Sequence, residues 1–384
     1  MATIAGGMPF VTRYEECREV LRDIASFSNA SGFKAPGVVI PPEDRLLGEL
    51  DPPRHTLVRR VMVTALTPRV VHEAEPFMAE TANRLLDAVP VPGAADLVPA
   101  FTVPLPNRVT VHLLGLPPED ADQLAAWAKE LMESGFPATN RSERGEGFAA
   151  AFPEFAGYID DQIERLDADT EADDVLARLV RLESDGERLP RRQVRALVRN
   201  LITGGLTTTS QLLGNLLFEL LRDPSVESVM RRDPAVLAGA IEESLRLAPP
   251  VLFIFRGCVH ATSVAGRAIT EGERVVVGTG SANRDEQVFP DGERFDATRP
   301  NAEQHLTFGY GQHVCPGAAL ARTVARVGLA TFFDRFPART VRLADGFQLE
   351  NVPTFFECGP RRLPGETLPG RARLTRRWRA GECS

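Results

Sequence analysis

The sequence predicts a mainly helical chain with a small β part, an α+β fold. Before Pro249, apolar side chains recur at the three- and four-residue spacing of amphipathic helices. After Pro249, the spacing changes to the alternation that is typical of short strands. A length of 384 residues would allow two or three domains, but Pro and Gly are scattered along the chain instead of gathering in a linker. We therefore expect one domain over residues 1–384.

Several helices are expected before the middle of the chain. Asp51-Pro52-Pro53 has the residue types of a helix start, with Asp as the N-cap and Pro in the first turn. Thr67-Pro68 has the same character and begins the next helix. The periodicity predicts helices over residues 14–24, 51–65, 67–86, 118–134, 148–166, 172–182 and 234–247.

The longest helix is expected to run from Arg191 to Leu221, because both of its halves carry apolar residues at helical spacing. At about 1.5 Å per residue it is roughly 46 Å long, which is enough to cross the molecule. Short strands are expected at 251–255, 261–269 and 274–279, and a first strand pair at about 3–12. A last long helix at 318–336 follows a glycine-rich loop.

The composition excludes several classes of function. The net charge is −8, whereas a protein that binds duplex nucleic acid usually carries a basic face. Five scattered cysteines with no C-x-x-C pair argue against a zinc ribbon and a secreted disulfide framework. There is no signal peptide and no apolar run of about 18 residues, so we expect a soluble, cytoplasmic protein that is not bound to a membrane.

The most informative stretch is Phe308-Gly-Tyr-Gly-Gln-His-Val-Cys-Pro-Gly317. Its glycines allow the backbone to approach a flat ligand closely. Cys315 comes just before the expected helix, whose N-terminus favours a thiolate. A thiolate in such a loop is what an axial haem ligand requires, and the alternative is a structural cysteine in a turn. The remaining cysteines are expected to be structural or surface thiols: Cys17, Cys258, Cys358 and Cys383.

The pattern F-G-x-G-x-H-x-C-x-G resembles the cysteine loop of the cytochrome P450 superfamily, and the resemblance covers residues 10–365 approximately. It implies the fold of that family, with the long helix over the haem, and a haem b whose axial ligand is the Cys315 thiolate. Glu243 and Arg246, at i and i+3, resemble the family's Glu-x-x-Arg pair, which Arg299 would complete. A surface salt bridge is the alternative for this pair.

The resemblance also implies how haem is held. His55 and Arg59 lie at i and i+4 on one helix face, Arg256 opens a later strand, and His313 precedes the cysteine by two residues. These four residues correspond to the family's contacts with the haem propionates, for which Arg offers bidentate hydrogen bonds. Phe308 and Gly309 belong to the cysteine loop and are expected to contact the cofactor as well.

The sequence departs from the family in the long helix, at Gly204-Gly205-Leu206-Thr207-Thr208-Thr209. Thr208 resembles the family's oxygen-activating threonine, but Thr207 occupies the position of an acid that helps to deliver protons. Three explanations stay open: Thr207 and water relay protons, the substrate or a carboxylate elsewhere does so, or the chemistry depends less on this relay. A fourth explanation is that variation at position 207 is simply tolerated.

The resemblance places a lipophilic substrate pocket over the haem. Its expected walls are the loop 31–47 and apolar side chains of later segments, and residues 131–155 are expected to form a mobile lid. No flavin or iron–sulfur segment is present, so electrons are expected from a ferredoxin and its reductase, docked at Arg59, Arg60, Arg322 and Arg326. The individual pocket residues are Thr203, Leu206, Leu252, Phe253 and Phe355.

The function expected from the resemblance is a bacterial-type, monomeric monooxygenase that inserts one atom of O₂ into a lipophilic small molecule, for which we expect a secondary metabolite. Two alternatives remain: a haem-thiolate enzyme that uses peroxide or catalyses oxidative coupling or dehydration, and a haem protein that binds a ligand without turnover. The chain opens almost directly on its first strand pair, where the family has a further helix. Either the start codon is assigned downstream of the true one or this member lacks that helix.

Overall fold

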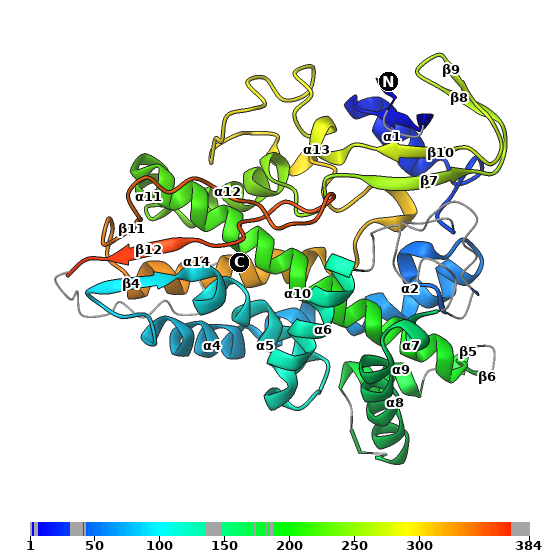
Figure 1. Ribbon diagram of the computed structural model, residues 1–384, viewed down its shortest axis with the longest axis horizontal. Coiled ribbons are helices and arrows are strands. Elements are labelled where there is room, and N and C mark those ends of the chain that lie inside the picture. The colour runs from blue at the N-terminus through cyan, green and yellow to red at the C-terminus, as the bar shows by residue number, and fades with distance from the viewer. Residues whose placement is uncertain are drawn as a thin grey trace.

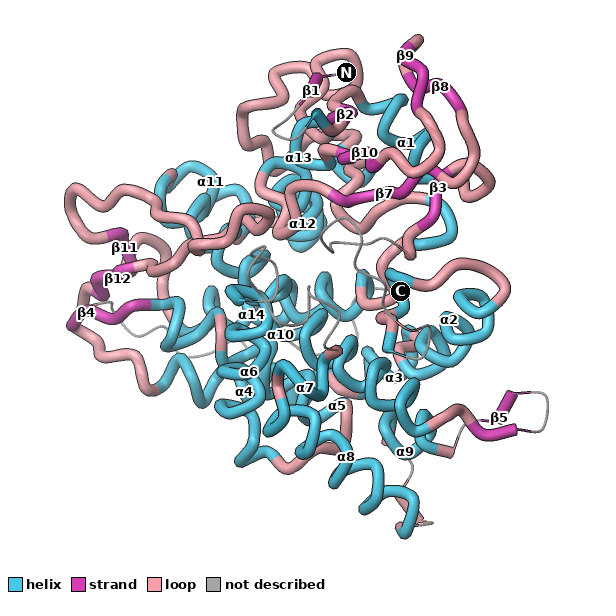
Figure 2. Tube along the Cα trace, turned by 45° about the vertical axis from the view of Figure 1, so that its right-hand side comes forward, coloured by secondary structure: helices cyan, strands magenta, loops and turns pink. Residues whose placement is uncertain are grey.

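The computed structural model describes residues 2–3, 7–30, 41, 44–134, 147–169, 171–172, 174–181, 183–184 and 187–369. Within these ranges it is mostly helical, with most of its strands gathered in two places at the edge of the helical body (Figures 1 and 2). This confirms the expected mainly α fold. None of the described helices is both long and apolar enough to cross a bilayer.

The central helix α10 runs from Arg191 to Arg222 and crosses the middle of the molecule (Figure 1), as the periodicity predicted. The α-helices besides α10 are, within the described residues, α1 (Tyr14–Arg22), α2 (Arg54–Ala65), α3 (Pro68–Glu73), α4 (Glu75–Asp87), α5 (Pro104–Leu113), α6 (Ala121–Ser134), α7 (Phe148–Ala151), α8 (Pro153–Ala168), α9 (Val175–Val180), α11 (Pro224–Met230), α12 (Pro234–Leu247), α13 (Thr279–Ala282) and α14 (Ala318–Arg335). Several of them pack against α10, among them α5, α6, α8, α12 and α14.

Several expected boundaries were wrong, mostly because of proline. The segment 67–86 is two helices, since α4 restarts after Ala74 with a proline in its first turn. The segment 148–166 breaks in the same way at Pro153. Asp51 does not cap α2: its carboxylate accepts hydrogen bonds from the Asn29 N–H at 3.0 Å and from the Ser28 hydroxyl, and the helix begins three residues later.

The larger sheet joins the start of the chain to its second half. Its strand order is β1 (Ala2–Thr3), β2 (Pro9–Val11), β10 (Arg274–Val277), β7 (Ile254–Cys258) and β3 (Phe27–Ser28). The pairing of β2 with β10 is parallel, and the others are antiparallel. The other strands are β11 (Val341–Leu343), β12 (Pro364–Thr367) and β4 (Gly93–Asp96) in a second sheet, and the hairpins β5 (Glu183–Ser184) with β6 (Glu187–Arg188) and β8 (Thr262–Val264) with β9 (Arg267–Ile269).

Helix α10 belongs to two separate hydrophobic clusters. Its N-terminal half, including Leu197 and Leu201, packs with α2, α6, α8 and α9. Its C-terminal half, including Leu213 and Leu217, packs with α4, α5, α12 and α14. Between the halves lies the stretch of glycine and threonine from Gly204 to Thr209. The helix is therefore fixed at both ends by apolar burial, while its middle is left for polar contacts.

Candidate functional site

A cavity of about 280 Å³ lies between the middle of α10 and the loop before α14. Gly204, Gly205 and Thr208 line it from α10, and Cys315 lines it from the loop. A Cβ added at Gly205 would come within 2.8 Å of the Thr110 hydroxyl, so glycine is what lets α5 approach α10 so closely. The other lining residues are Leu47, Gly48, His55, Arg59, Met62, Leu66, Thr110, Leu113, Leu114, Asn200, Leu201, Thr209, Phe308, His313, Pro316, Gly317, Leu320 and Ala321.

Backbone geometry holds Cys315 at the edge of this cavity. Its N–H donates to the Phe308 carbonyl at 2.8 Å, which closes the loop. Gly309 and Gly311 adopt φ of +77° and +75°, a conformation that favours glycine. The side chain of Cys315 is exposed toward the cavity, and a Cβ added at Gly317 would lie 3.8 Å from its Sγ. The loop therefore presents one thiol to a concave, mostly apolar space.

The thiol itself does not favour the charged state, contrary to the expectation from the helix N-terminus. Helix α14 begins at Ala318, three residues after the cysteine. Burial raises the pKa of Cys315, and the Gly317 N–H and the cations Arg59 and Arg322 only oppose that effect. A bound metal ion reverses the balance, because a coordinating thiol is deprotonated outright.

Cationic and imidazole groups gather at one side of the cavity. The rings of His55 and His313 lie 4.0 Å apart, and both nitrogens of His55 and Nδ1 of His313 are buried without a hydrogen-bond partner. Burial, together with the charges of His55, Arg256 and Arg59, lowers the pKa of His313 to about 3. Arg256 is 5% exposed, and burial lowers its pKa to about 10. Among the described residues, no carboxylate lies within ion-pair distance of Arg256.

This arrangement fits haem. Buried imidazoles and guanidinium groups without acidic partners are suited to bind two carboxylates, which haem carries as propionates. The cavity between them and α10 is lined mostly by apolar side chains, and Cys315 contributes the one thiol among its lining residues. Arg59 lines the same space and donates to the Val314 carbonyl at 2.7 Å, next to the cysteine. The sequence-predicted set His55, Arg59, His313, Phe308 and Cys315 is thus brought together.

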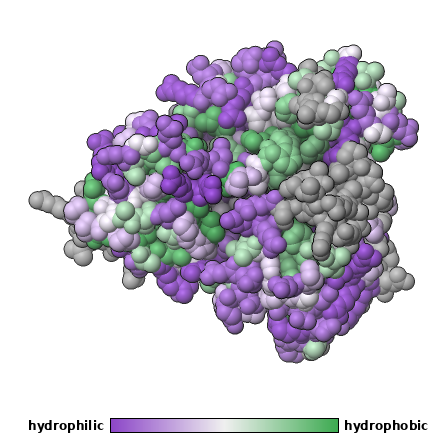
Figure 3. All heavy atoms as spheres, in the orientation of Figure 1, coloured by the Kyte–Doolittle hydropathy of each residue, from purple (hydrophilic) through white to green (hydrophobic). Residues whose placement is uncertain are grey.

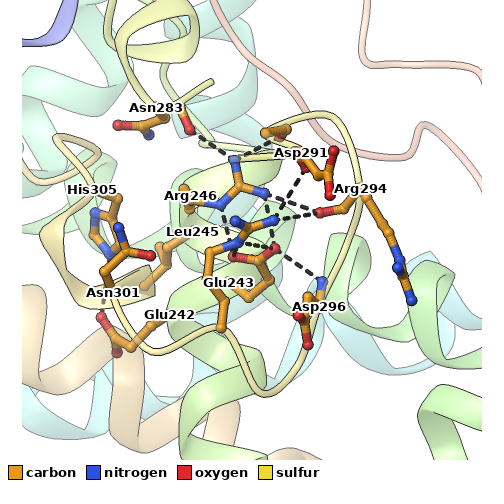
Figure 4. Close-up of polar contacts among 12 residues, drawn as sticks. Glu242, Glu243, Leu245, Arg246, Asn283, Asp291, Arg294, Asp296, Asn301 and His305 are labelled. Carbon is orange, nitrogen blue, oxygen red and sulfur yellow. Dashed lines mark hydrogen bonds and ion pairs between the residues drawn. The ribbon is translucent and has the colours of Figure 1, made fainter. Parts of the chain in front are cut away.

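Glu243 and Arg246 meet in a buried cluster (Figure 4). Arg299 completes this cluster through its own ion pair with Glu243. The Glu243 carboxylate accepts from Arg246 Nε at 2.7 Å and NH2 at 2.8 Å, and from Arg299 Nε at 3.0 Å. Their side chains are 0%, 0% and 7% exposed, so this is no surface salt bridge. Arg246 also donates to the carbonyls of Asn283 and Gly292. The cluster therefore fixes the segment that leads to the cysteine loop against α12.

The threonines of α10 point in different directions. Thr208 lines the cavity, and its hydroxyl donates to the Gly204 carbonyl at 2.8 Å, one turn earlier. The Thr207 hydroxyl is buried without a hydrogen-bond partner. A residue that sequence reasoning did not find, Glu357, lies beside Thr207 and Gln211 and is 5% exposed. Nothing in the sequence signals this contact, because the two segments are distant in the chain.

The five proposed pocket residues do not line the cavity. Thr203 is buried and donates to the Arg199 carbonyl at 2.9 Å, and Leu206 is 2% exposed inside the hydrophobic cluster around α6 and α8. Phe253 and Phe355 pack against each other with ring centroids 5.6 Å apart, near Leu252, which packs beside Gly280. Phe355 is 60% exposed. Figure 3, in the orientation of Figure 1, shows apolar side chains gathered between polar ones on the face that it presents.

Most of the loop 31–47 and the centre of 131–155 lie outside the described residues, as does Cys383.

Two of the four arginines that were expected to dock a ferredoxin form ion pairs with carboxylates of this chain. Arg322 forms a two-pronged ion pair with Glu242 at 2.7 Å and lies over the Phe308 ring. Arg326 pairs with Glu75 at 2.6 Å. The charge of both is therefore largely balanced within the chain. Arg60 is exposed, and it adjoins Arg59 on α2.

Comparison with known proteins gives a consistent picture. The family model described as Cytochrome P450 matches residues 140–346. The chain is 34% identical to cyclomarin C epoxidase CymV of Salinispora arenicola, over 91% of this chain and 88% of that one. It is 33% identical to 6-deoxyerythronolide B hydroxylase of Saccharopolyspora erythraea, over 85% of this chain and 82% of the relative.

Solved structures agree with these relatives. A mutant of P450 EryK in complex with erythromycin B aligns with a TM-score of 0.87 and 31% identity, over 97% of this chain and 94% of that chain. The post-tailoring hydroxylase HmtN, involved in himastatin biosynthesis, aligns with a TM-score of 0.80 and 31% identity, over 93% and 90% of the two chains.

Proposed function

Since this chain belongs to the cytochrome P450 family, we propose that it inserts one atom of O₂ into a lipophilic secondary metabolite, with electrons from a separate ferredoxin and reductase. It is an oxidoreductase, a haem-dependent monooxygenase like its named relatives. The relatives named for cyclomarin C, 6-deoxyerythronolide B and himastatin support a substrate of that class, a polyketide or a peptide. We propose that residues 1–384 work as one haem-thiolate domain.

Different residues at the cavity are proposed to bind different parts of haem. Cys315 would ligate the iron of haem through its thiolate, and the bound haem would supply the oxygen chemistry of the site. Arg59, Arg256, His55 and His313 hold the two propionates. Phe308 packs at the cavity wall, and Gly309 keeps the loop in the turn that Cys315 needs.

The observation that carries this assignment is the single thiol facing a cavity beside buried cationic groups without acidic partners. The reduced carbon monoxide spectrum of the purified protein tests it. The thiolate signature is expected in the unaltered protein and is absent from Cys315→Ser, while Cys358→Ser is a control that keeps it. A substrate-induced spin-state shift of the ferric haem across a library of polyketides and peptides then identifies the substrate.

Thr208 is placed to orient O₂ and water in the cavity, because its hydroxyl lines that space and is anchored to the Gly204 carbonyl. Thr208→Ala is expected to lower the share of consumed electrons that reach product, with peroxide as the main by-product. Thr203→Ala is a matched control, since its hydroxyl makes the same backbone contact away from the cavity. Equal coupling in the two variants would refute this role.

A small acidic ferredoxin is the proposed electron donor, and Arg60, which is exposed and follows Arg59 on α2, is the cation proposed to dock it. Attraction between opposite charges predicts slower association as salt rises. Arg60→Glu is the cleaner test, because Arg322→Glu would also break the ion pair with Glu242. Electron transfer that is insensitive to both salt and Arg60→Glu would refute the docking site.

The threonine at position 207 favours a second candidate, a haem-thiolate enzyme that uses peroxide or catalyses oxidative coupling or dehydration. Hydrogen peroxide already carries the protons that O₂ chemistry must receive from the protein. Product formation with a ferredoxin and reductase, compared with hydrogen peroxide alone, separates the two. Product from peroxide only would favour the second candidate.

A further inference from the structure

The carboxyl group of Glu357 is buried against the middle of α10. It is 5% exposed, and its Oε2 accepts from the Thr354 hydroxyl at 3.1 Å. Its Oε1 is buried without a hydrogen-bond partner, and so is the hydroxyl of the neighbouring Thr207. A charged carboxylate in such surroundings is unfavourable unless it is paired, so the neutral acid is favoured here.

The position of this carboxyl group is fixed by the packing of its own segment. Asn215 Nδ2 donates to the Cys358 carbonyl at 3.1 Å, and a Cβ added at Gly359 would come within 2.5 Å of Gln211. Because Thr207, Gln211 and Asn215 are four residues apart, they lie on one face of α10. Figure 1 shows the red C-terminal segment crossing over that helix. Glu357 is thus held at the end of this face, beside Thr207.

The electrostatic surroundings favour a carboxyl group that holds its proton. Burial raises the pKa of Glu357, while the nearby polar side chains of Gln211, Thr354 and Thr207 oppose that effect. The charge of Glu133, on α6, raises the pKa further. A carboxyl group whose pKa is raised thus lies next to a hydroxyl that has no other partner.

We propose that Glu357 supplies the acid that α10 lacks at Thr207, and that it delivers protons through the Thr207 hydroxyl to the cavity lined by Thr208. This inference rests on the proposed monooxygenase function, in which each O₂ consumes two electrons and two protons as one oxygen atom leaves in water. The carboxyl O–H gives its proton to Thr207 Oγ1 while the hydroxyl proton of Thr207 moves on toward the cavity. The carboxylate then takes up a proton from solvent, so that neither residue is changed by a turnover.

A first experiment detects the proton on the Glu357 carboxyl group and does not require turnover. Infrared difference spectra of the haem-loaded protein in H₂O and D₂O at pH 7 are recorded for the unaltered chain, Glu357→Gln and Glu350→Gln. Glu350 is a matched control, because it lies in the same segment with its side chain 55% exposed. The carbonyl band of a protonated carboxylic acid is expected in the unaltered chain and in Glu350→Gln, and it is missing from Glu357→Gln. The same band in all three would overturn the proposal.

A second experiment measures NADPH oxidation by a ferredoxin, its reductase and O₂, with no organic substrate. Glu357→Gln and Thr207→Val are each expected to slow it about tenfold or more and to raise its solvent deuterium isotope effect, because both interrupt one proton path. Thr207→Asp in the Glu357→Gln background is expected to restore the rate. A merely structural role of Glu357 would not produce that rescue.

The outcomes separate this inference from the function on which it rests. Unchanged rates in Glu357→Gln or no rescue by Thr207→Asp would overturn the proton path, whatever the infrared spectra show. An unaltered protein that shows the acid band but oxidises no NADPH would refute the ferredoxin-dependent function. An unaltered protein that turns over without the band would refute the proposal for Glu357 alone.

Discussion

Replacing Glu243 by glutamine is expected to lower the free energy of unfolding by about 3–5 kcal/mol, the typical cost of leaving a buried charge without its partner. The magnitude follows from what the carboxylate holds. It accepts two hydrogen bonds from Arg246, one from Arg299 and one from the Asp296 N–H at 2.9 Å. Glutamine keeps the shape but removes the charge and one acceptor oxygen. Two buried guanidinium groups then face an amide, and one of its donors points at them.

Urea unfolding of the haem-loaded protein, followed by circular dichroism, measures this loss. Arg299→Gln is expected to cost less, because Glu243 keeps its two bonds to Arg246. The control is Glu73→Gln, which breaks an exposed i,i+4 pair with Arg69 whose side chains are 59% and 86% exposed. That change is expected to leave the free energy of unfolding within the error of measurement. Equal effects of Glu243→Gln and Glu73→Gln would refute the argument from burial.

Three further predictions concern charges near the cavity. Arg256→Gln is expected to speed haem loss to an excess haem-binding protein by about tenfold or more, the equivalent of one charge-assisted hydrogen bond of about 1.5 kcal/mol; an unchanged rate would show that Arg256 does not hold a propionate. Burial raises the pKa of Glu242, but hydrogen bonds from Arg322 and His305 outweigh it and lower the value to about 2. The stabilisation by Glu242 is therefore complete above its unfolded pKa of about 4.5 and is lost as pH falls toward 2. In urea titrations, the free energy of unfolding of Glu242→Gln should accordingly lie below that of the unaltered protein at neutral pH, and the difference should shrink as pH falls toward 2. A difference that stays constant with pH would contradict the sign. Because the pKa of Glu357 is raised, the folded chain binds more protons there than the unfolded chain, and stability falls as pH rises above about 4.5. Glu357→Gln should thus gain stability relative to the unaltered protein as pH rises above about 4.5, whereas a pH-independent difference would argue against a raised pKa.

Local patterns in the sequence predicted much of the fold. The apolar spacing of α10 and α12 placed both helices within a residue of their observed ends, because burial of one face decides such helices. The short helix α5 and the helix α11 were not predicted, and the proline breaks within 67–86 and 148–166 were read as continuous helix. Pro in the first turn starts a helix as readily as it ends one, so spacing alone does not separate the two cases.

The site was predictable where residues lie close together in the chain. Cys315, His313 and Phe308 share one loop, and His55 and Arg59 share one helix face. Long-range partners were not predictable. Glu242 takes up the charge of Arg322 from 80 residues away, and Glu357 reaches α10 through the fold alone. Neither contact leaves a local pattern, since each depends on how the helices pack.

The buried cluster around Glu243 also sets an order of events on the ribosome. Glu243 is synthesised 56 residues before Arg299, and the carbonyls that accept from Arg246 come from the stretch between Arg246 and Arg299. At about 5–20 residues per second, roughly 3 to 11 seconds of translation separate the first charges from the last. Until then, α12 carries groups that cannot be buried at low cost, so it stays hydrated or is held by a chaperone. The loop with Cys315 is synthesised only after Arg299, so the haem ligand joins the nascent chain later than every member of this cluster.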